Sequence, residues 1–163
     1  MPIVKIVSGG QTGADRAALD VAIGHGLEVG GWVPKSRRAE DGRIPEHYSG
    51  LVETDSTDPA VRTAWNVRDS DATLIVSHGR LSGGSGLTLE EATGLGRPVL
   101  HLDLHELGAA SATTRLRAWL ADVSPRVLNV AGPRASGDPT IYAAVTTLLR
   151  SALVNSDGTH TDV

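Results

Sequence analysis

The sequence predicts an α/β fold with a doubly wound, mostly parallel sheet of about five strands and helices on both faces. Short β-branched runs alternate with Ala- and Leu-rich segments of helical periodicity, which is typical of parallel sheets with right-handed crossovers. The apolar runs are continuous, as in strands covered on both faces. The length of 163 residues suits one domain, which we expect over residues 1–154, followed by a flexible tail over residues 155–163.

Each element of this fold follows from a local pattern. The predicted strands are residues 3–7, 27–34, 72–77, 97–104 and 126–132. Helical spacing predicts helices over residues 14–26, 58–70, 87–96, 111–123 and 137–154. The second of these helices opens with Asp58 as its N-cap and Pro59 at its first position. Residues 34–50 are polar and broken by Pro and Gly, so they predict a long loop that is either a lid over a pocket or simply solvated.

The composition argues against several classes of function. The net charge is −4 and the chain has no long run of Lys or Arg, so we expect no nucleic-acid polymer as a partner. Without cysteine the chain has no disulfide, no thiolate metal ligand and no cysteine nucleophile. No stretch approaches about 18 continuous apolar residues, so we expect no membrane partner and a cytoplasmic protein.

The first glycine-rich segment, SGGQTG, lies between the first predicted strand and the first predicted helix. Such a turn presents backbone N–H groups at a helix N-terminus, where phosphate binds well. The spacing fits neither a P-loop, which needs a lysine, nor a G-x-G-x-x-G fingerprint. The alternative is a tight turn with Thr12 as N-cap and Asp15 as the capping carboxylate. The candidate binding residues here are Ser8, Gly9, Gly10, Gln11, Thr12, Gly13, Asp15 and Arg16.

A second glycine-rich segment, SGGSGLT, has the same character and also follows a predicted strand. Its glycines allow close backbone approach, and its hydroxyl groups can donate hydrogen bonds to an anion. Two such segments suggest a ligand with more than one anionic or polar group. Glu90 and Glu91 follow in the helix, where acids are either partners of the helix dipole or catalytic groups. The candidate binding residues here are Ser82, Gly83, Gly84, Ser85, Gly86 and Thr88.

A third segment, NVAGPRASGDP, follows the last predicted strand. Asn129, Gly132 and Arg134 are its candidate binding residues, and an Arg suits an oxyanion because it can donate two parallel hydrogen bonds. All three segments follow strands, and ligands of doubly wound sheets bind beyond the carboxyl ends of the strands. We therefore expect the three segments to meet in one site.

Other chemistries have weaker support. The segment HLDLH at residues 101–105 places two histidines on one face of a strand, but the end of a strand explains it more simply, so we expect no metal site. A serine nucleophile lacks the G-x-S-x-G elbow that would support it.

Several segments, taken in order, resemble the molybdenum cofactor carrier family, within the Rossmann-like SLOG/LOG (lysine-decarboxylase-like) superfamily. They are SGGQTGADRAALD, GWVPKSRRAEDGRIP, RTAWNVRDSDATLIVS, LSGGSGLT and NVAGPRAS, and they extend over nearly the whole chain. The resemblance implies a Rossmann-like domain that forms homo-oligomers, as dimers or tetramers. It implies that the bound cargo is the molybdenum cofactor (molybdopterin), a pterin with a terminal phosphate, or its nucleotide form, held without chemistry.

The resemblance also carries an alternative activity. Phosphoribohydrolases of the same superfamily have a Gly-Gly-x-Gly-Thr-x-x-Glu loop, whose glutamate and an upstream arginine serve hydrolysis. Here Leu87 precedes Thr88 as an insertion, and the slip rotates Glu90 and Glu91 by about 100° around the helix. This rotation argues against hydrolysis but leaves the phosphate-binding role intact. The alternative function is a nucleoside 5′-monophosphate phosphoribohydrolase with Glu90 or Glu91 as general acid/base and Arg16 or Arg134 binding the phosphate. A nucleotide sensor without chemistry is another.

Overall fold

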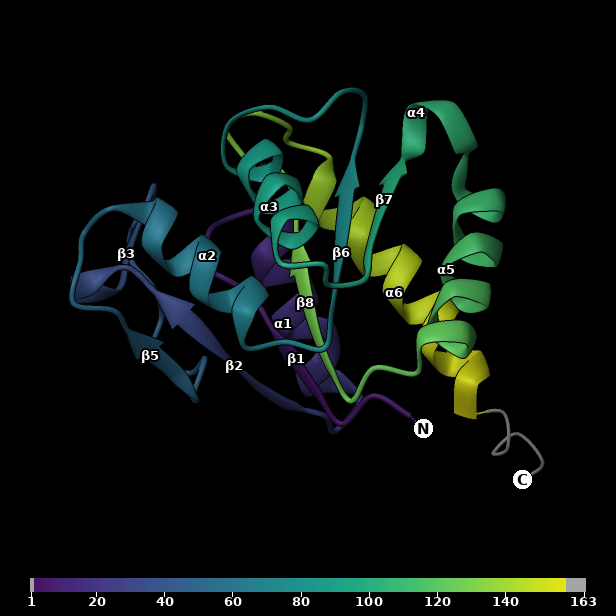
Figure 1. The fold of residues 1–163 in the computed structure, drawn as a ribbon, viewed down its shortest axis with the longest axis horizontal. Coiled ribbons are helices and arrows are strands. Elements are labelled where there is room, and N and C mark those ends of the chain that lie inside the picture. Colours follow the sequence, from purple (N-terminus) through teal and green to yellow (C-terminus); the bar gives the residue numbers. More distant parts are fainter. Residues whose placement is uncertain (1, 158–163) are drawn as a thin grey trace.

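The computed structural model describes residues 2–157 and contains a six-stranded sheet in which every strand pair is parallel (Figure 1). The strand order is β5-β2-β1-β8-β6-β7, so β8, the last strand of the sheet in the chain, lies between β1 and β6. The predicted fold class is confirmed. The strands are β1 (Lys5–Val7), β2 (Glu28–Val33), β5 (Leu51–Glu53), β6 (Ala72–Ser77), β7 (Val99–Asp103) and β8 (Val127–Ala131).

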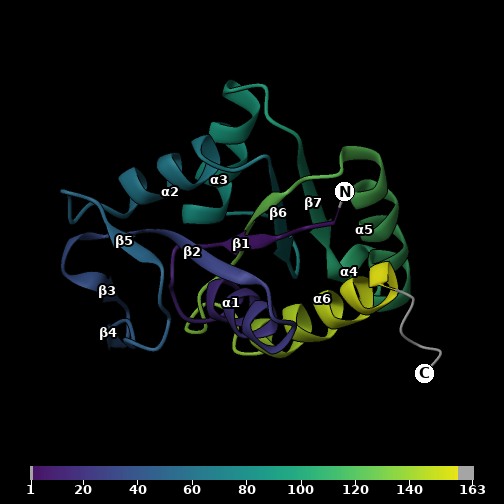
Figure 2. The same ribbon diagram turned by 90° about the horizontal axis from the view of Figure 1, so that it is seen from below.

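Helices cover both faces of the sheet. Figure 2 shows α2 and α3 on one face and α1 and α6 on the other. None of the helices in residues 2–157 is long and apolar enough to cross a membrane. The helices are α1 (Ala14–Gly24), α2 (Pro59–Arg68), α3 (Gly83–Gly94), α4 (Leu104–Leu107), α5 (Ala109–Val123) and α6 (Ile141–Asp157).

The structure has strands that the sequence pattern did not predict. The sixth strand, β5, has three residues, too few to show a periodicity. The predicted loop of residues 34–50 contains a 3₁₀ turn, η1 (Lys35–Arg37), and an antiparallel hairpin of β3 (Arg38–Ala39) and β4 (Gly42–Arg43). This hairpin is fixed by a small hydrophobic cluster of Leu19, Val33, Ala39, Ile44 and Tyr48.

Two helices extend beyond their predicted ends. The helix α3 begins at Gly83 rather than at residue 87, because the glycines of SGGSG form its first turn instead of a loop. The helix α6 continues to Asp157, three residues past the predicted end of the domain. Residues 158–163 of the predicted tail lie outside the described residues. The start of α2 is as predicted, since the Asp58 side chain accepts a hydrogen bond from the amide of Ala60, 3.0 Å away.

The two faces of the sheet differ in polarity. On the face covered by α1 and α6, Ile6, Leu74 and Leu128 are fully buried in an aliphatic core. Side chains alternate along a strand, so the neighbouring residues Thr73 and Asn129 point to the other face, where they are also buried. We call the buried polar side chains between the sheet and the α2–α3 pair the polar layer. Its members are Arg62, Asn66, Thr73, Ser77 and Asn129.

The aliphatic core predicts a large cost for truncating Leu128. We expect Leu128→Ala to lower the free energy of unfolding by about 2–5 kcal/mol, since it leaves a cavity between β8 and the helices below it. Chemical denaturation measures this change. The matched control is Leu95→Ala, because Leu95 is half exposed and its truncation leaves no cavity. Equal losses in the two variants would contradict the assignment of the core.

Candidate functional site

A cleft of about 830 Å³ opens at the carboxyl ends of the central strands. It is lined by segments that follow β1, β6 and β8, together with residues of α2 and α3. The three predicted segments therefore meet at one site, as expected of ligand sites in doubly wound sheets. The predicted residues that line the cleft are Gly9, Gln11, Asp15, Ser82, Gly83, Gly84, Ser85, Thr88, Asn129, Gly132 and Arg134.

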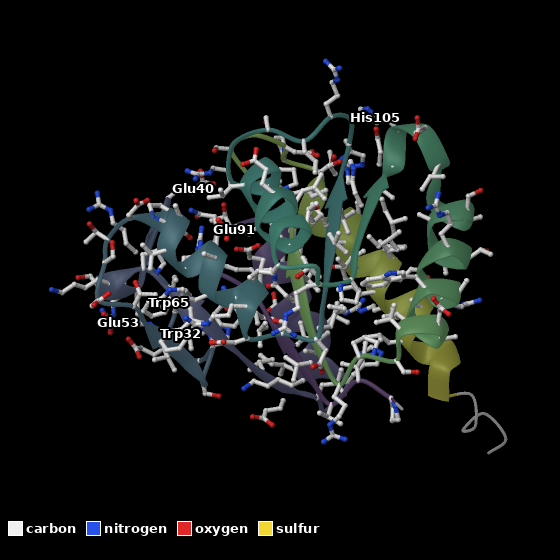
Figure 3. The ribbon with its side chains drawn as sticks, viewed as in Figure 1. Trp32, Glu40, Glu53, Trp65, Glu91 and His105 are labelled. Atoms are coloured by element: carbon white, nitrogen blue, oxygen red, sulfur yellow. The ribbon has the colours of Figure 1, made fainter. Side chains whose placement is uncertain are left out.

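Other predicted residues do not line this cleft. They are Ser8, Gly10, Thr12, Gly13, Arg16 and Gly86, and the alternative catalytic residues Glu90 and Glu91. Glu90 is exposed on α3, and Glu91, which is labelled in Figure 3, is half-buried. Ser85 and Thr88 line the cleft from the start of α3, whereas Glu90 lies on the opposite side of the helix from Thr88 and Glu91 lies almost one turn further along it.

The first glycine-rich turn uses its own amides internally. The amide of Gln11 donates to the Asp15 carboxylate over 3.1 Å, and the amide of Thr12 donates to the Gln11 side chain over 3.0 Å. The Gly10 amide donates to the Ser8 hydroxyl over 3.4 Å. These donors stabilise the turn itself.

The capping alternative for this turn is wrong in its N-cap. Gly13 is the N-cap of α1 and makes no side-chain cap. The Thr12 hydroxyl instead donates to Glu40 of the β3–β4 hairpin and accepts from the amide of Ala135 over 3.0 Å. Thr12 therefore joins the first turn to the segment after β8.

Arg16 is held by the β3–β4 hairpin. Its guanidinium donates two hydrogen bonds to Asp41, of 2.6 and 2.8 Å, and a third to the carbonyl of Gly10 over 3.0 Å. The hydrogen bond with Asp41 raises the pKa of Arg16, and the same pair lowers the pKa of Asp41. This arginine braces the turn from outside the cleft.

Arg62 on α2 is a cleft residue that the sequence reasoning missed. It is only 9% exposed, and its Nη1 donates to the carbonyl of Gly9 over 2.7 Å. Its Nε lies 3.3 Å from the Thr63 hydroxyl, and its Nη2 makes no hydrogen bond to any described residue. A signal was present in the sequence, because Arg62 and Asn66 are polar residues four positions apart on the buried face of a helix.

The contact between Arg62 and the first turn requires glycine. A Cβ atom on Gly9 would lie 2.4 Å from Arg62 Nη1, which is closer than real contacts allow. The absence of a side chain at Gly9 therefore lets the guanidinium reach the end of β1. Burial lowers the pKa of Arg62, and the charge of Asp15 opposes that shift.

Asp15 lies in the same cleft and is 7% exposed. Burial raises its pKa to about 6, although the charge of Arg62 and hydrogen bonds from the amides of Gln11 and Gly9 act in the opposite direction. The floor of the cleft thus holds a cation and a carboxyl group that changes charge close to neutral pH.

The N-terminus of α3 has free hydrogen-bond donors. Its N-cap, Ser82, makes no side-chain cap, and Gly83 and Gly84 are exposed to the cleft. The Ser85 side chain is nine-tenths buried, lines the cleft and forms no hydrogen bond with another described residue. Thr88 is different, since its hydroxyl donates to the carbonyl of Gly84 over 2.9 Å. The amides and the Ser85 hydroxyl together can bind an anion.

The segment after β8 forms the next wall. Gly132 packs against the end of β6, because a Cβ there would lie 2.5 Å from the carbonyl oxygen of Val76. Arg134 lines the cleft and lies 3.9 Å from Glu40, which also accepts hydrogen bonds of 3.1 and 2.5 Å from Ser136. Glu40 therefore fixes the segment that carries Arg134.

Two histidines also line the cleft. His78 follows β6, and its Nδ1 lies 2.6 Å from the carboxylate of Asp138. Its ring lies 5.1 Å from that of His105, which Figure 3 shows near the start of α4. His101 instead contacts the Ser77 hydroxyl at 2.7 Å. Within residues 2–157, no group of three or more His, Cys, Asp or Glu side chains is arranged to hold a metal ion.

The pKa of Asp15 predicts how stability depends on pH. The folded state binds this proton more tightly than the unfolded state, where the pKa is near 3.8, so the contribution of Asp15 to stability is lost as the pH rises through about 6. We expect Asp15→Asn to raise the free energy of unfolding by about 1–3 kcal/mol near pH 8, with the gain shrinking toward pH 4.

Urea unfolding across this pH range measures the effect of Asp15→Asn. Asp122→Asn is the matched control, because Asp122 is exposed on α5. A gain that stays constant with pH, or that appears equally in the control, would contradict the effect of burial on Asp15.

Comparison with known proteins agrees with the fold. Residues 6–153 match the family model described as the circularly permutated YpsA SLOG family. The crystal structure of a protein from Syntrophus aciditrophicus SB, named "Putative molybdenum carrier protein", is 53% identical, with a TM-score of 0.90, over 93% of this chain and 95% of that one. The search of curated proteins found no match. On the extent of the family match, this chain belongs to the circularly permutated YpsA SLOG family.

Proposed function

We propose that this protein binds and carries the molybdenum cofactor, or a related phosphorylated pterin or nucleotide, without chemistry on it. The name of the Syntrophus protein supports a carrier function, given 53% identity over nearly the whole chain. The cleft supports a small anionic ligand, since cations and free helix amides line it.

The observation that carries the proposal is the free N-terminus of α3 facing the cleft. The Ser85 hydroxyl lines the cleft and has no hydrogen-bond partner among the described residues, and Gly83 and Gly84 leave room for a ligand to approach the helix amides. These donors open on the cleft, so a ligand oxygen could accept hydrogen bonds from them. We assign the terminal phosphate of the cargo to this end of the cleft.

The polar layer supplies the second half of the site. Arg62 uses Nη1 for the Gly9 carbonyl, which leaves Nη2 as a donor without a partner among the described residues. The Asn129 Nδ2 donates a hydrogen bond to the Thr73 hydroxyl over 3.2 Å, while its Oδ1 has no partner among the described residues. A pterin has a ring edge with neighbouring carbonyl and N–H groups. A donor and an acceptor at the floor of one cleft suit such an edge.

The distribution of carboxylates favours a carrier over a phosphoribohydrolase. Glu90 and Glu91 lie outside the cleft, and Arg16 is held by Asp41. Glu90, Glu91 and Arg16, three of the residues expected to serve hydrolysis, therefore do not line the cleft.

One observation still supports hydrolysis as a second candidate. Asp15 lines the cleft with Arg62, and burial raises its pKa to about 6, which is suitable for a general acid near neutral pH. Cleavage of an N-glycosidic bond needs such a group beside the leaving base.

The carrier proposal is tested by binding of purified molybdenum cofactor under anaerobic conditions. We expect saturable binding at micromolar protein, weakened about 10- to 100-fold in Arg62→Met, because that variant removes a charged donor from the cleft. Ser85→Ala should weaken binding about tenfold. Arg115→Met is the control, since Arg115 is exposed on α5. Absence of saturable binding to the wild-type protein would overturn the proposal.

The hydrolysis candidate is tested by incubating the protein with a panel of nucleoside 5′-monophosphates and measuring free base. The carrier proposal expects no turnover above the buffer blank. Turnover that is abolished by Asp15→Asn, with the fold retained, would show that the protein is an enzyme and overturn the carrier proposal.

Assembly into a dimer or tetramer remains a prediction, and light scattering on a sizing column tests it.

A further inference from the structure

His78 and Asp138 form a pair across two loops at one end of the cleft. His78 comes directly after β6, five residues before the start of α3, and Asp138 precedes α6. The two side chains are only 20% and 16% exposed, and their contact distance is 2.6 Å. Both residues line the cleft.

Asp138 is held in its charged form. Its Oδ1 accepts hydrogen bonds from the amide and the hydroxyl of Thr140, of 3.1 and 2.9 Å, while its Oδ2 contacts His78. Burial acts to raise the pKa of Asp138, but the hydrogen bonds from His78 and Thr140 outweigh it and lower that pKa. A fixed carboxylate therefore sets the orientation of the imidazole ring.

The second nitrogen of His78 has no such partner. Its Nδ1 is used by Asp138, and its Nε2 forms no hydrogen bond with any described residue. His78 and the N-terminus of α3 line the same cleft, and four residues, 79–82, separate them in the chain. A histidine oriented through one nitrogen and unused at the other is suited to contact a ligand.

We propose that His78 is a further ligand-binding residue, which donates a hydrogen bond from Nε2 to the anionic group at the N-terminus of α3, and that Asp138 is its positioning residue. The inference deepens the proposed function and rests on it, because it assumes an anion at that place. The expected ligand chemistry is a phosphate or another oxyanion with an accessible oxygen.

The charge of the pair makes this contact dependent on protonation. With His78 protonated the pair is neutral overall and Nε2 is a donor; with His78 neutral the pair carries one negative charge and repels an anion. The other charged or titratable groups of the cleft are Asp15, Arg62, Arg80, His105 and Arg134. Asp103, which accepts a hydrogen bond of 2.8 Å from the Gly79 amide, lies beside the same loop. Affinity for an anion should therefore fall as the pH rises.

Sulfate is the appropriate probe, because its charge is constant where a phosphate monoester titrates near pH 6. Titrations at constant ionic strength, followed by the NMR shifts of the Gly83 and Gly84 amides, give the dissociation constant at several pH values between about 6 and 8. For the wild-type protein we expect affinity to fall about five- to tenfold across this range, the scale of one partly screened charge interaction.

Three variants separate ligand contact from a structural role. His78→Gln should bind sulfate about five- to tenfold more weakly near pH 6, and any pH dependence that it keeps belongs to groups such as Asp15. Asp138→Asn should also weaken binding near pH 6, because the ring loses the carboxylate that orients it. His25→Gln is the control, since His25 is exposed at the end of α1.

The outcomes are distinct. Wild-type binding with an unchanged affinity and pH profile in His78→Gln would overturn the role of His78 while leaving the proposed anion site intact. If His78→Gln or Asp138→Asn loses thermal stability but keeps the wild-type pH profile of sulfate binding, the pair has only a structural role. That result would also overturn the inference. No shift of the α3 amides at any pH in the wild-type protein would overturn both the inference and the proposed phosphate position.

Discussion

The contact that the rest of the site depends on is the hydrogen bond from the buried Arg62 guanidinium to the carbonyl of Gly9. It joins α2 to the end of β1 and fixes where the first glycine-rich turn begins. A buried cation is costly unless its surroundings compensate, and here a backbone carbonyl and the nearby Asp15 do so. The remaining donor of Arg62 is left at the floor of the cleft. One residue thus links the packing of a helix to the chemistry of the site.

The polar layer explains why the two faces of the sheet serve different purposes. Below the sheet, aliphatic side chains hold α1 and α6 in place by burial. Above it, directional bonds add to the burial of Ile75 and Val67: Asn66 donates to the carbonyl of Trp32 over 3.0 Å and accepts from its amide over 2.7 Å, as a neighbouring strand would. Trp32 also contacts Trp65 of α2 edge to face, with ring centroids 4.9 Å apart (Figure 3). The helices above the sheet are therefore positioned by few and specific contacts, and polar groups remain available to a ligand.

Much of the fold could be predicted from the sequence, because it depends on local periodicity. The central strands and most helices of the structure match the predicted ranges. By contrast, β5 and the two strands of the β3–β4 hairpin are too short to show a hydrophobic periodicity. The meeting of three segments at one cleft followed from topology. The role of individual residues did not: Arg16 and Arg62 look alike in sequence, and only tertiary contacts send the first to Asp41 and the second into the cleft. Likewise, Ser85 lines the cleft while Glu91, further along α3, does not, and the sequence alone does not show where along the helix the cleft ends.

Glu40 of the β3–β4 hairpin limits how far the loops around the cleft can change shape when a ligand binds. It receives hydrogen bonds from Thr12 and Ser136, and its own amide donates to Gln11 over 2.9 Å, so three loops around the cleft are tied together by the protein itself. These loops are ordered before a ligand binds, so little conformational entropy is lost on binding. Forms with and without a ligand should then present nearly the same outer surface. On the proposed carrier function, a partner that receives the ligand would have to recognise the ligand itself, through the open mouth of the cleft, and not a change in shape.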